Sequence, residues 1–203
     1  MNLLAHGYLS TVPRDHPTAG LMVGNFLGDF IKGAPDHPRH HLQPEVVAGV
    51  RLHRIIDAFT DSHPDVALVR DLLHPRCHKY AGVAVDVFFD HFLARQFTTL
   101  TGLTLAEFIP TYYQTLQQHE ANFPEPARRM LSALITHNWL PHYATFDGVD
   151  RSLRGIARRT QFPSGLDTAV LDLEQFYEPI GEAFGRFWPQ LVAEVARFGE
   201  KAL

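Results

Sequence analysis

The sequence contains very little cysteine and very little lysine. Cys77 is the only cysteine in 203 residues, so no disulfide can form within the chain and nothing indicates an oxidising compartment. Only three of the 18 basic residues are lysines, namely Lys32, Lys79 and Lys201. The net charge is -4 and the pI is about 6.3, so the basic surface that nucleic-acid binding requires is not expected.

Long apolar runs are also absent. No window approaches the roughly 18 uninterrupted apolar residues of a transmembrane helix, and no basic segment precedes the short apolar patch near the N-terminus. We therefore expect no membrane span and no signal peptide, and a cytoplasmic location. The hydrophobic content of 45% is ample for a buried core, which argues against disorder. We expect one compact domain over residues 1–203.

Apolar residues recur at spacings of three and four along almost the whole chain, which is the period of an amphipathic helix. No β-type alternation extends beyond a few residues. The sequence therefore predicts an all-α helical bundle, with bends near Pro179 and Pro189 because each proline removes a backbone donor. The expected helices cover residues 18–32, 44–61, 64–73, 79–97, 104–119, 126–137 and 147–159, followed by one long or kinked helix over 166–198.

Common phosphate-binding and nucleophile motifs are missing. Gly20, Gly24 and Gly28 are spaced by four inside an expected helix, which favours close helix packing over a loop that cradles phosphate. No GxSxG motif occurs, and Cys77 lies in no catalytic signature.

Polar residues instead interrupt the apolar faces of three expected helices. His53, Asp57 and Asp61 follow one another at spacings of four, so their side chains stack along one side of a helix. One histidine and two carboxylates in a line make half of a metal site. The alternative for any single such residue is a hydrogen-bonded core or capping role.

Pairs of polar residues four apart occur in two other apolar helices. Asp86 and Asp90 are four residues apart within an apolar run, and so are Asn25 and Asp29. Buried carboxylates are costly unless they are paired or bound to a cation. Because facing helices assemble metal sites in bundles, the three helices together predict a site for a divalent cation such as Mn, Fe, Zn or Mg.

One basic row bears on the choice of partner. Arg151, Arg154 and Arg158 lie at spacings of three and four on one helix face, with Arg159 beside them. A solvated charged face is the simple explanation. The alternative is a docking surface for an acidic partner, since concentrated positive charge speeds the encounter with a negative one.

Four segments occur together in a recognisable order, namely the opening MNLLAH, GNFLGDFIKG, LHRIIDAFTD and VDVFFDHFLARQF. With the terminal KAL, they make the chain resemble the acyl carrier protein phosphodiesterase family over almost its whole length. This resemblance implies an all-α fold related to the HD-domain metal-dependent phosphohydrolases. It also implies hydrolysis of the phosphodiester between 4′-phosphopantetheine and a serine of holo-acyl carrier protein, with Mn²⁺ as the favoured cofactor and Mg²⁺ or Fe²⁺ as alternatives.

The resemblance also implies which residues form the site. The first choices for metal ligands are Asp29, His53, Asp57 and Asp90. His6 and Asp86 are either further ligands or residues that hold a ligand in place. We expect Asp90 to bind metal directly and Asp86 to orient a ligand or a water.

Three further residues are catalytic candidates: Arg54, Asp61 and His91. Arg54 could steady the non-bridging phosphate oxygens, or be a surface ion-pair partner. His91 could give a proton to the leaving group, or orient Asp90. For docking of the acidic carrier protein, we expect the arginine row at residues 151–159.

Two other functions compete with this one. The first keeps the metal site but acts on a nucleotide or another small phosphate ester, in which case the arginine row would have no purpose. The second is a non-catalytic helical binding module whose buried carboxylates pair with arginines. Such a module would hold no stoichiometric divalent ion.

Overall fold

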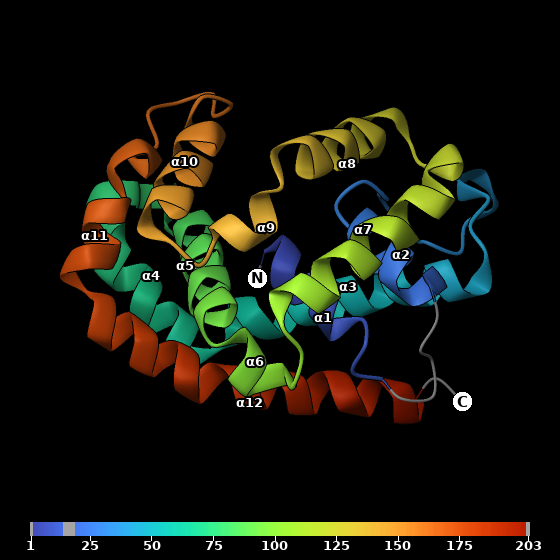
Figure 1. Cartoon of the computed structure of the whole chain (residues 1–203), viewed down its shortest axis with the longest axis horizontal. Helices are drawn as coiled ribbons and strands as arrows, with labels where there is room; N and C mark the ends of the chain where they lie inside the picture. The colour runs from blue at the N-terminus through green and yellow to red at the C-terminus, as the bar shows by residue number, and fades with distance from the viewer. Residues whose placement is uncertain (1, 14–18, 202–203) are drawn as a thin grey trace.

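A computed structural model describes residues 2–13 and 19–201, and every regular element in these ranges is a helix (Figure 1). The predicted all-α fold is therefore confirmed. No helix in the described ranges is long and apolar enough to cross a lipid bilayer. The α-helices are α1 (Leu3–Leu9), α2 (Ala19–Leu27), α3 (Pro44–Ser62), α4 (Pro64–Cys77), α5 (Ala81–Arg95), α6 (Phe97–Thr101), α7 (Leu105–His119), α8 (Glu125–His137), α9 (Trp139–His142), α10 (Phe146–Ala157), α11 (Val170–Gln175) and α12 (Tyr177–Lys201).

Local sequence signals explain several helix ends. α3 begins at Pro44, where a proline costs no hydrogen bond. α7 begins with a capping box, in which the side chains of Thr104 and Glu107 each accept a backbone N–H of the other residue. The C-terminal segment breaks at Phe176, three residues before Pro179, whereas α12 continues through Pro189. The expected bend near the first proline is therefore present, and the helix does not end at the second.

Other boundaries differ from the expected ones. α2 ends at Leu27 rather than at residue 32, because Gly28 lies directly against the ring of His53 and the chain turns there. α1 and α9 were not expected, since helices of seven and four residues carry too short an apolar period to be recognised.

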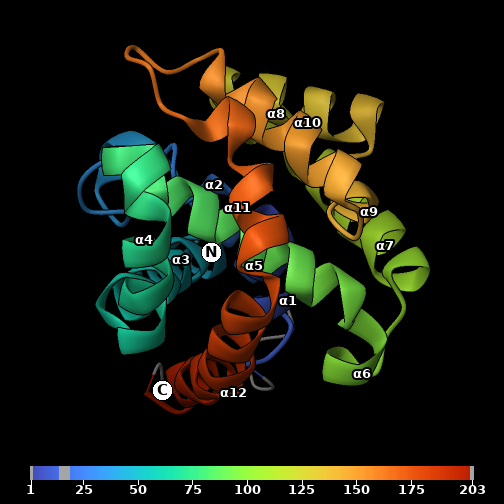
Figure 2. The same cartoon turned by 90° about the vertical axis from the view of Figure 1, so that its left-hand side faces the viewer.

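The core lies between α5 and the long α12. Phe88 and Phe89 of α5 and Phe184 and Phe187 of α12 are all fully buried. Figure 2 shows α12 along one side of the molecule, with α8 and α10 on the opposite side of α5. α12 also packs against α4 and against α3, the helix that carries His53, Asp57 and Asp61.

The closest helix packing joins α2 to α3. A Cβ atom on Gly24 would collide with the carbonyl oxygen of Val46, and one on Gly49 would collide with the carbonyl oxygen of Leu21. The expectation that the glycines at spacings of four serve helix packing is thus confirmed. This contact places Asn25, on α2, beside the face of α3 that carries His53.

We expect Gly24→Ala to lower the free energy of unfolding by about 1–3 kcal/mol, the cost of forcing extra atoms into a packed contact. Gly185→Ala on α12 is the matched control, because a Cβ there meets no atom within 4 Å. That change should raise stability by up to about 1 kcal/mol, the usual difference between glycine and alanine in a helix. Urea unfolding of both variants measures the difference, and equal effects would contradict the close contact.

Candidate metal centre and the adjoining pocket

Three side chains converge where α1 meets α3. His6 comes from α1, and His53 and Asp57 come from α3. Nε2 of His53 lies 3.0 Å from one carboxylate oxygen of Asp57, and Nε2 of His6 lies 3.2 Å from the other. One ligand atom from each residue lies within 4.8 Å of the other two, which is close enough for all three to bind one metal ion.

Asn25 contacts both imidazole rings and fixes their orientation. Its side-chain oxygen lies 2.8 Å from Nδ1 of His6, and its backbone carbonyl oxygen accepts a hydrogen bond from Nδ1 of His53 at 2.9 Å. Its amide nitrogen donates to the His6 carbonyl oxygen and to the Ser10 hydroxyl, which fixes the orientation of the amide. Since each Nδ1 is engaged by Asn25, each Nε2 is the nitrogen directed at Asp57. Such a hydrogen bond behind a ligating histidine is typical of metal sites.

Packing holds the rings in the same place. The rings of His6 and His53 stack at a centroid distance of 4.2 Å, and both residues are buried. Gly28 lies against the ring of His53 so closely that a Cβ atom would overlap it. The position of His53 therefore depends on the absence of a side chain at residue 28.

A pocket of about 360 Å³ opens over this cluster, and further acidic residues line it. Asp29 lies 3.5 Å from Nε2 of His53, and its side chain is 76% exposed. Asp61 and Asp86 also line the pocket. The structure thus brings together six of the residues selected from the sequence: His6, Asp29, His53, Asp57, Asp61 and Asp86.

The acidic neighbours strongly shift the charge of the site. Burial disfavours a charged His53, but its hydrogen bonds with Asp29 and Asp57 outweigh this and raise its pKa to about 9. Burial likewise disfavours a charged Asp57, yet its hydrogen bonds with His53 and His6 hold its pKa well below the usual range. Burial lowers the pKa of His6. At neutral pH His53 is therefore a cation with a proton on each ring nitrogen, beside the ionised carboxylates of Asp29 and Asp57.

This donor set fits a divalent transition metal. Two imidazole nitrogens with one or two carboxylates suit Mn, Fe or Zn, with the second carboxylate coming from Asp29. A metal ion would have to displace the proton from His53. Its affinity should therefore increase as the pH rises towards 9, because protons compete less well at higher pH.

Asp90, expected to be a direct ligand, has a different role. Its two carboxylate oxygens accept the backbone N–H groups of Leu4 and Ala5, at 2.9 and 3.2 Å, and it does not line the pocket. Asp90 thus satisfies donors at the start of α1, which have no partner within the helix. Burial raises its pKa to about 7. Asp86, by contrast, lines the pocket.

Two catalytic candidates also lie outside the pocket lining. Arg54 donates to the carbonyl oxygens of Ile31 and Gly33, so it braces the loop after α2. His91 is buried, with Nδ1 bonded to the carbonyl oxygen of Tyr143 and Nε2 3.2 Å from the Tyr177 hydroxyl. These contacts give both residues a structural role, and their expected roles at the phosphate and the leaving group stay predictions.

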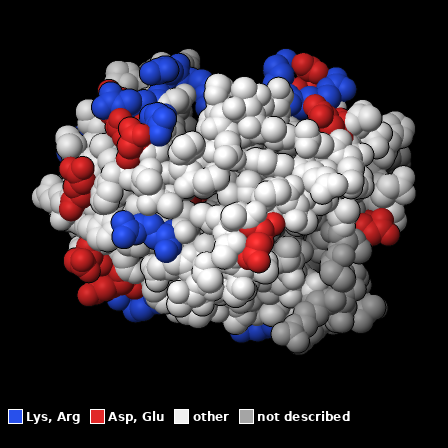
Figure 3. All heavy atoms as spheres, in the orientation of Figure 1, with Lys and Arg blue, Asp and Glu red and all other residues white. Residues whose placement is uncertain are grey.

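The arginine row lies on α10 and just beyond it, where Figure 3 shows basic and acidic side chains intermixed at the upper left. Arg151 pairs with Asp147 and Arg154 with Asp150. The row also borders two different hollows. Arg151 and Arg159 line one cavity, whereas Arg154 and Arg158 line another.

Two residues are more important to this site than the sequence pattern predicts, namely His6 and Asn25. The sequence resemblance favours Asp90 over His6 as a ligand, and the helical spacing pairs Asn25 only with Asp29. The signals were present, since His6 is a lone histidine in an apolar segment and Asn25 lies four residues before Asp29. What periodicity cannot reveal is that both meet His53 in space.

We expect His6→Ala, His53→Ala and Asp57→Ala each to weaken Mn²⁺ binding at least about 100-fold, since even residues behind the ligands cost 10–100-fold. Asp29→Ala should have a smaller effect, because its carboxylate is more exposed and farther from the cluster. Titration calorimetry measures the affinity, and circular dichroism checks the fold. His74→Ala, at an exposed histidine of α4, is the control. Unchanged affinity in any of the first three would remove that residue from the ligand set.

Asp90→Asn should separate a structural role from a ligand role. We expect it to retain stoichiometric Mn²⁺, whereas Asp90→Ala should lower stability by about 1–3 kcal/mol for each N–H left without an acceptor. Metal content and thermal unfolding of the two variants provide the measurement. Loss of metal from Asp90→Asn with an unchanged unfolding midpoint would restore Asp90 as a ligand.

Comparison with known proteins agrees with the resemblance seen in the sequence. Residues 1–191 match the family described as acyl carrier protein phosphodiesterase. A protein of that name from Salmonella paratyphi A is 30% identical over 198 residues, which cover 97% of this chain and 98% of the relative. Another of that name, from Photorhabdus laumondii subsp. laumondii, is 32% identical over 193 residues, covering 95% and 93%. No solved structure matches the chain. On the match to almost its full length, this chain belongs to the acyl carrier protein phosphodiesterase family.

Proposed function

We propose that this chain is a divalent-metal-dependent phosphodiesterase that removes 4′-phosphopantetheine from the serine of holo-acyl carrier protein. Membership of the family supports the substrate. The observation that carries the chemistry is the convergence of His6, His53 and Asp57 at the base of an open pocket. A phosphodiester is an anion that resists attack, and a cation site beside an open pocket can offset its charge and activate water for its hydrolysis.

His6, His53 and Asp57 would hold the ion, with Asp29 completing the set. A divalent ion, Mn²⁺ as first choice and Mg²⁺ or Fe²⁺ as alternatives, supplies a Lewis acid at the phosphoryl oxygen and lowers the pKa of water. Asn25 keeps both imidazoles in the tautomer that leaves Nε2 available. To bind an ion, His53 would have to give up the Nε2 proton that Asp29 and Asp57 stabilise.

Asp61 is our candidate for a proton acceptor in the pocket. It follows Asp57 by one turn of α3 and lines the pocket without belonging to the metal cluster. A carboxylate in this position can accept the proton of the attacking water. Asp86, on the facing α5, would orient the same water or a ligand, as we expected from the sequence.

The α10 arginines would receive the acidic carrier protein. Arg151 and Arg159 lie at the edge of a cavity that adjoins the metal pocket through shared residues, so a protein docked there would present its serine to the site. Exposed ion pairs such as that of Arg151 with Asp147 contribute little stability, so these arginines can exchange partners at low cost.

The test is incubation of Mn²⁺-loaded protein with holo-carrier protein, followed by mass measurement of the carrier. We expect conversion to the apo form, abolished by EDTA and reduced at least about 100-fold in Asp57→Ala. Added salt should slow the reaction with the carrier more than that with a small generic phosphodiester, because salt screens exposed charges.

Two outcomes would contradict the proposal. Intact carrier together with hydrolysis of nucleotides or small phosphate esters would indicate a small-molecule phosphohydrolase. Intact carrier together with no stoichiometric metal in the purified protein would indicate a non-catalytic binding module.

A further inference from the structure

A second cavity, of about 400 Å³, adjoins the metal pocket. Both hollows are lined by Asn2, Leu3 and Met130, so these residues form their common border. The volume lies in the range of roughly 300–1,000 Å³ that is usual for small-molecule sites. None of the cluster residues His6, His53 and Asp57 lines this second cavity. The candidate metal site therefore does not explain why this second cavity is present.

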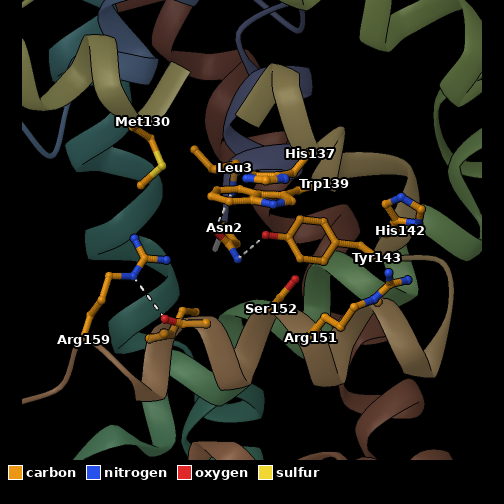
Figure 4. A pocket seen from close by; sticks show the side chains of 13 residues that line it. Asn2, Leu3, Met130, His137, Trp139, His142, Tyr143, Arg151, Ser152 and Arg159 are labelled. Carbon is orange, nitrogen blue, oxygen red and sulfur yellow. Dashed lines mark hydrogen bonds between the residues drawn. The ribbon is translucent and has the colours of Figure 1, made fainter. Parts of the chain in front are cut away.

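Several helices enclose the cavity, as Figure 4 shows. Met130 projects from α8, and Trp139 from α9 stacks on His137 at a centroid distance of 5.9 Å. Asn2 donates to the hydroxyl of Tyr143 at 3.2 Å beneath them. The opposite wall is α10, which presents Ser152 to the cavity. The walls are thus held by stacking and hydrogen bonding within the protein.

The cavity lining combines apolar and neutral polar groups with two histidines and two arginines. Met130, Trp139 and Ile156 offer apolar surface, while Ser152 and Asn2 offer hydrogen-bonding groups. Of the two arginines, Arg151 pairs with Asp147, whereas Arg159 donates to the carbonyl oxygen of Gly155 and keeps its positive charge. Away from these arginines, the lining suits an elongated ligand that carries amides and a hydroxyl between methylene groups.

The pantetheine arm of the proposed substrate has this chemistry. It extends from the phosphate as a neutral chain of amides, methylenes and a branched dimethyl group, and it ends in a thiol. We propose that this cavity holds the pantetheine arm while the phosphate lies in the metal pocket, an inference that rests on the proposed function. The common border at Asn2, Leu3 and Met130 is where the arm would pass from one hollow to the other.

Gly155 lines the cavity, so a larger side chain at this position would reduce the space for a ligand. It lies three residues after Ser152 and four before Arg159, so all three share the face of the chain that lines the cavity. A Cβ atom at Gly155 meets no atom within 4 Å, which means that larger side chains can enter the cavity without a clash in the helix. Gly185 of α12 is the matched control, since it is exposed and its added Cβ also meets nothing.

The first measurement is binding of free pantetheine, followed by tryptophan fluorescence. The chain has two tryptophans, of which Trp188 is buried and Trp139 lines the cavity. We expect pantetheine to change the emission of the wild type and of the Gly185 variants, and to have no such effect in Trp139→Phe. Across the series Gly155→Ala, Gly155→Leu and Gly155→Phe, affinity should fall in steps, by at least tenfold for phenylalanine.

The second measurement compares two substrates. In Gly155→Phe, kcat/KM for holo-carrier protein should fall at least tenfold relative to kcat/KM for a generic phosphodiester that lacks the arm. Gly185→Phe should leave this ratio unchanged. Circular dichroism confirms folding, and Gly155→Leu takes the place of the phenylalanine variant if that variant does not fold.

Three results would overturn the inference. They are no fluorescence response of the wild type to millimolar pantetheine, equal affinity across the Gly155 series, and an unchanged ratio between the two substrates. Failure of the proposed function looks different. In that case the wild type leaves holo-carrier protein intact, yet pantetheine still binds at Trp139 and is still excluded by the Gly155 variants.

Discussion

The hydrogen bonds of Asn25 are the interaction on which the site depends. One residue of α2 engages Nδ1 of His6 through its side chain and Nδ1 of His53 through its backbone. Both Nε2 atoms are thereby turned towards Asp57. This is feasible only because Gly24 and Gly49 let α2 and α3 touch along their backbones. The arrangement of this candidate metal site therefore depends on helix packing more than on any one sequence motif.

The charge balance of the cluster follows from the same geometry. Asp29 and Asp57 face a buried imidazole, and together they keep a proton on it well above neutral pH. The proton gives His53 a positive charge, which reduces the repulsion between the two carboxylates. With His53 protonated, Asp29 and Asp57 leave one negative charge uncompensated, and a divalent ion in place of that proton would balance both carboxylates.

Features that depend on residues close in the sequence were predictable, and long-range contacts were not. The spacing of four placed His53 and Asp57 on one side of α3, as the structure has them. The same spacing made Asp90 look like a ligand, because periodicity does not show that its partners are backbone N–H groups of α1. A spacing of three and four also covers a broad arc of α10, and for this reason the arginine row borders two hollows instead of one.

The shortness of α1 has a dynamic consequence. A seven-residue helix is too short to be stable alone, so α1 persists through its contacts with α2 and α5. It also supplies His6, which joins the metal cluster. An ion bound there can be retained fully only while α1 stays docked, so ion binding lowers the population of locally opened states. Amide hydrogen exchange in α1 should thus be slower at higher metal concentration, because a bound ion stabilises the docked position of this helix.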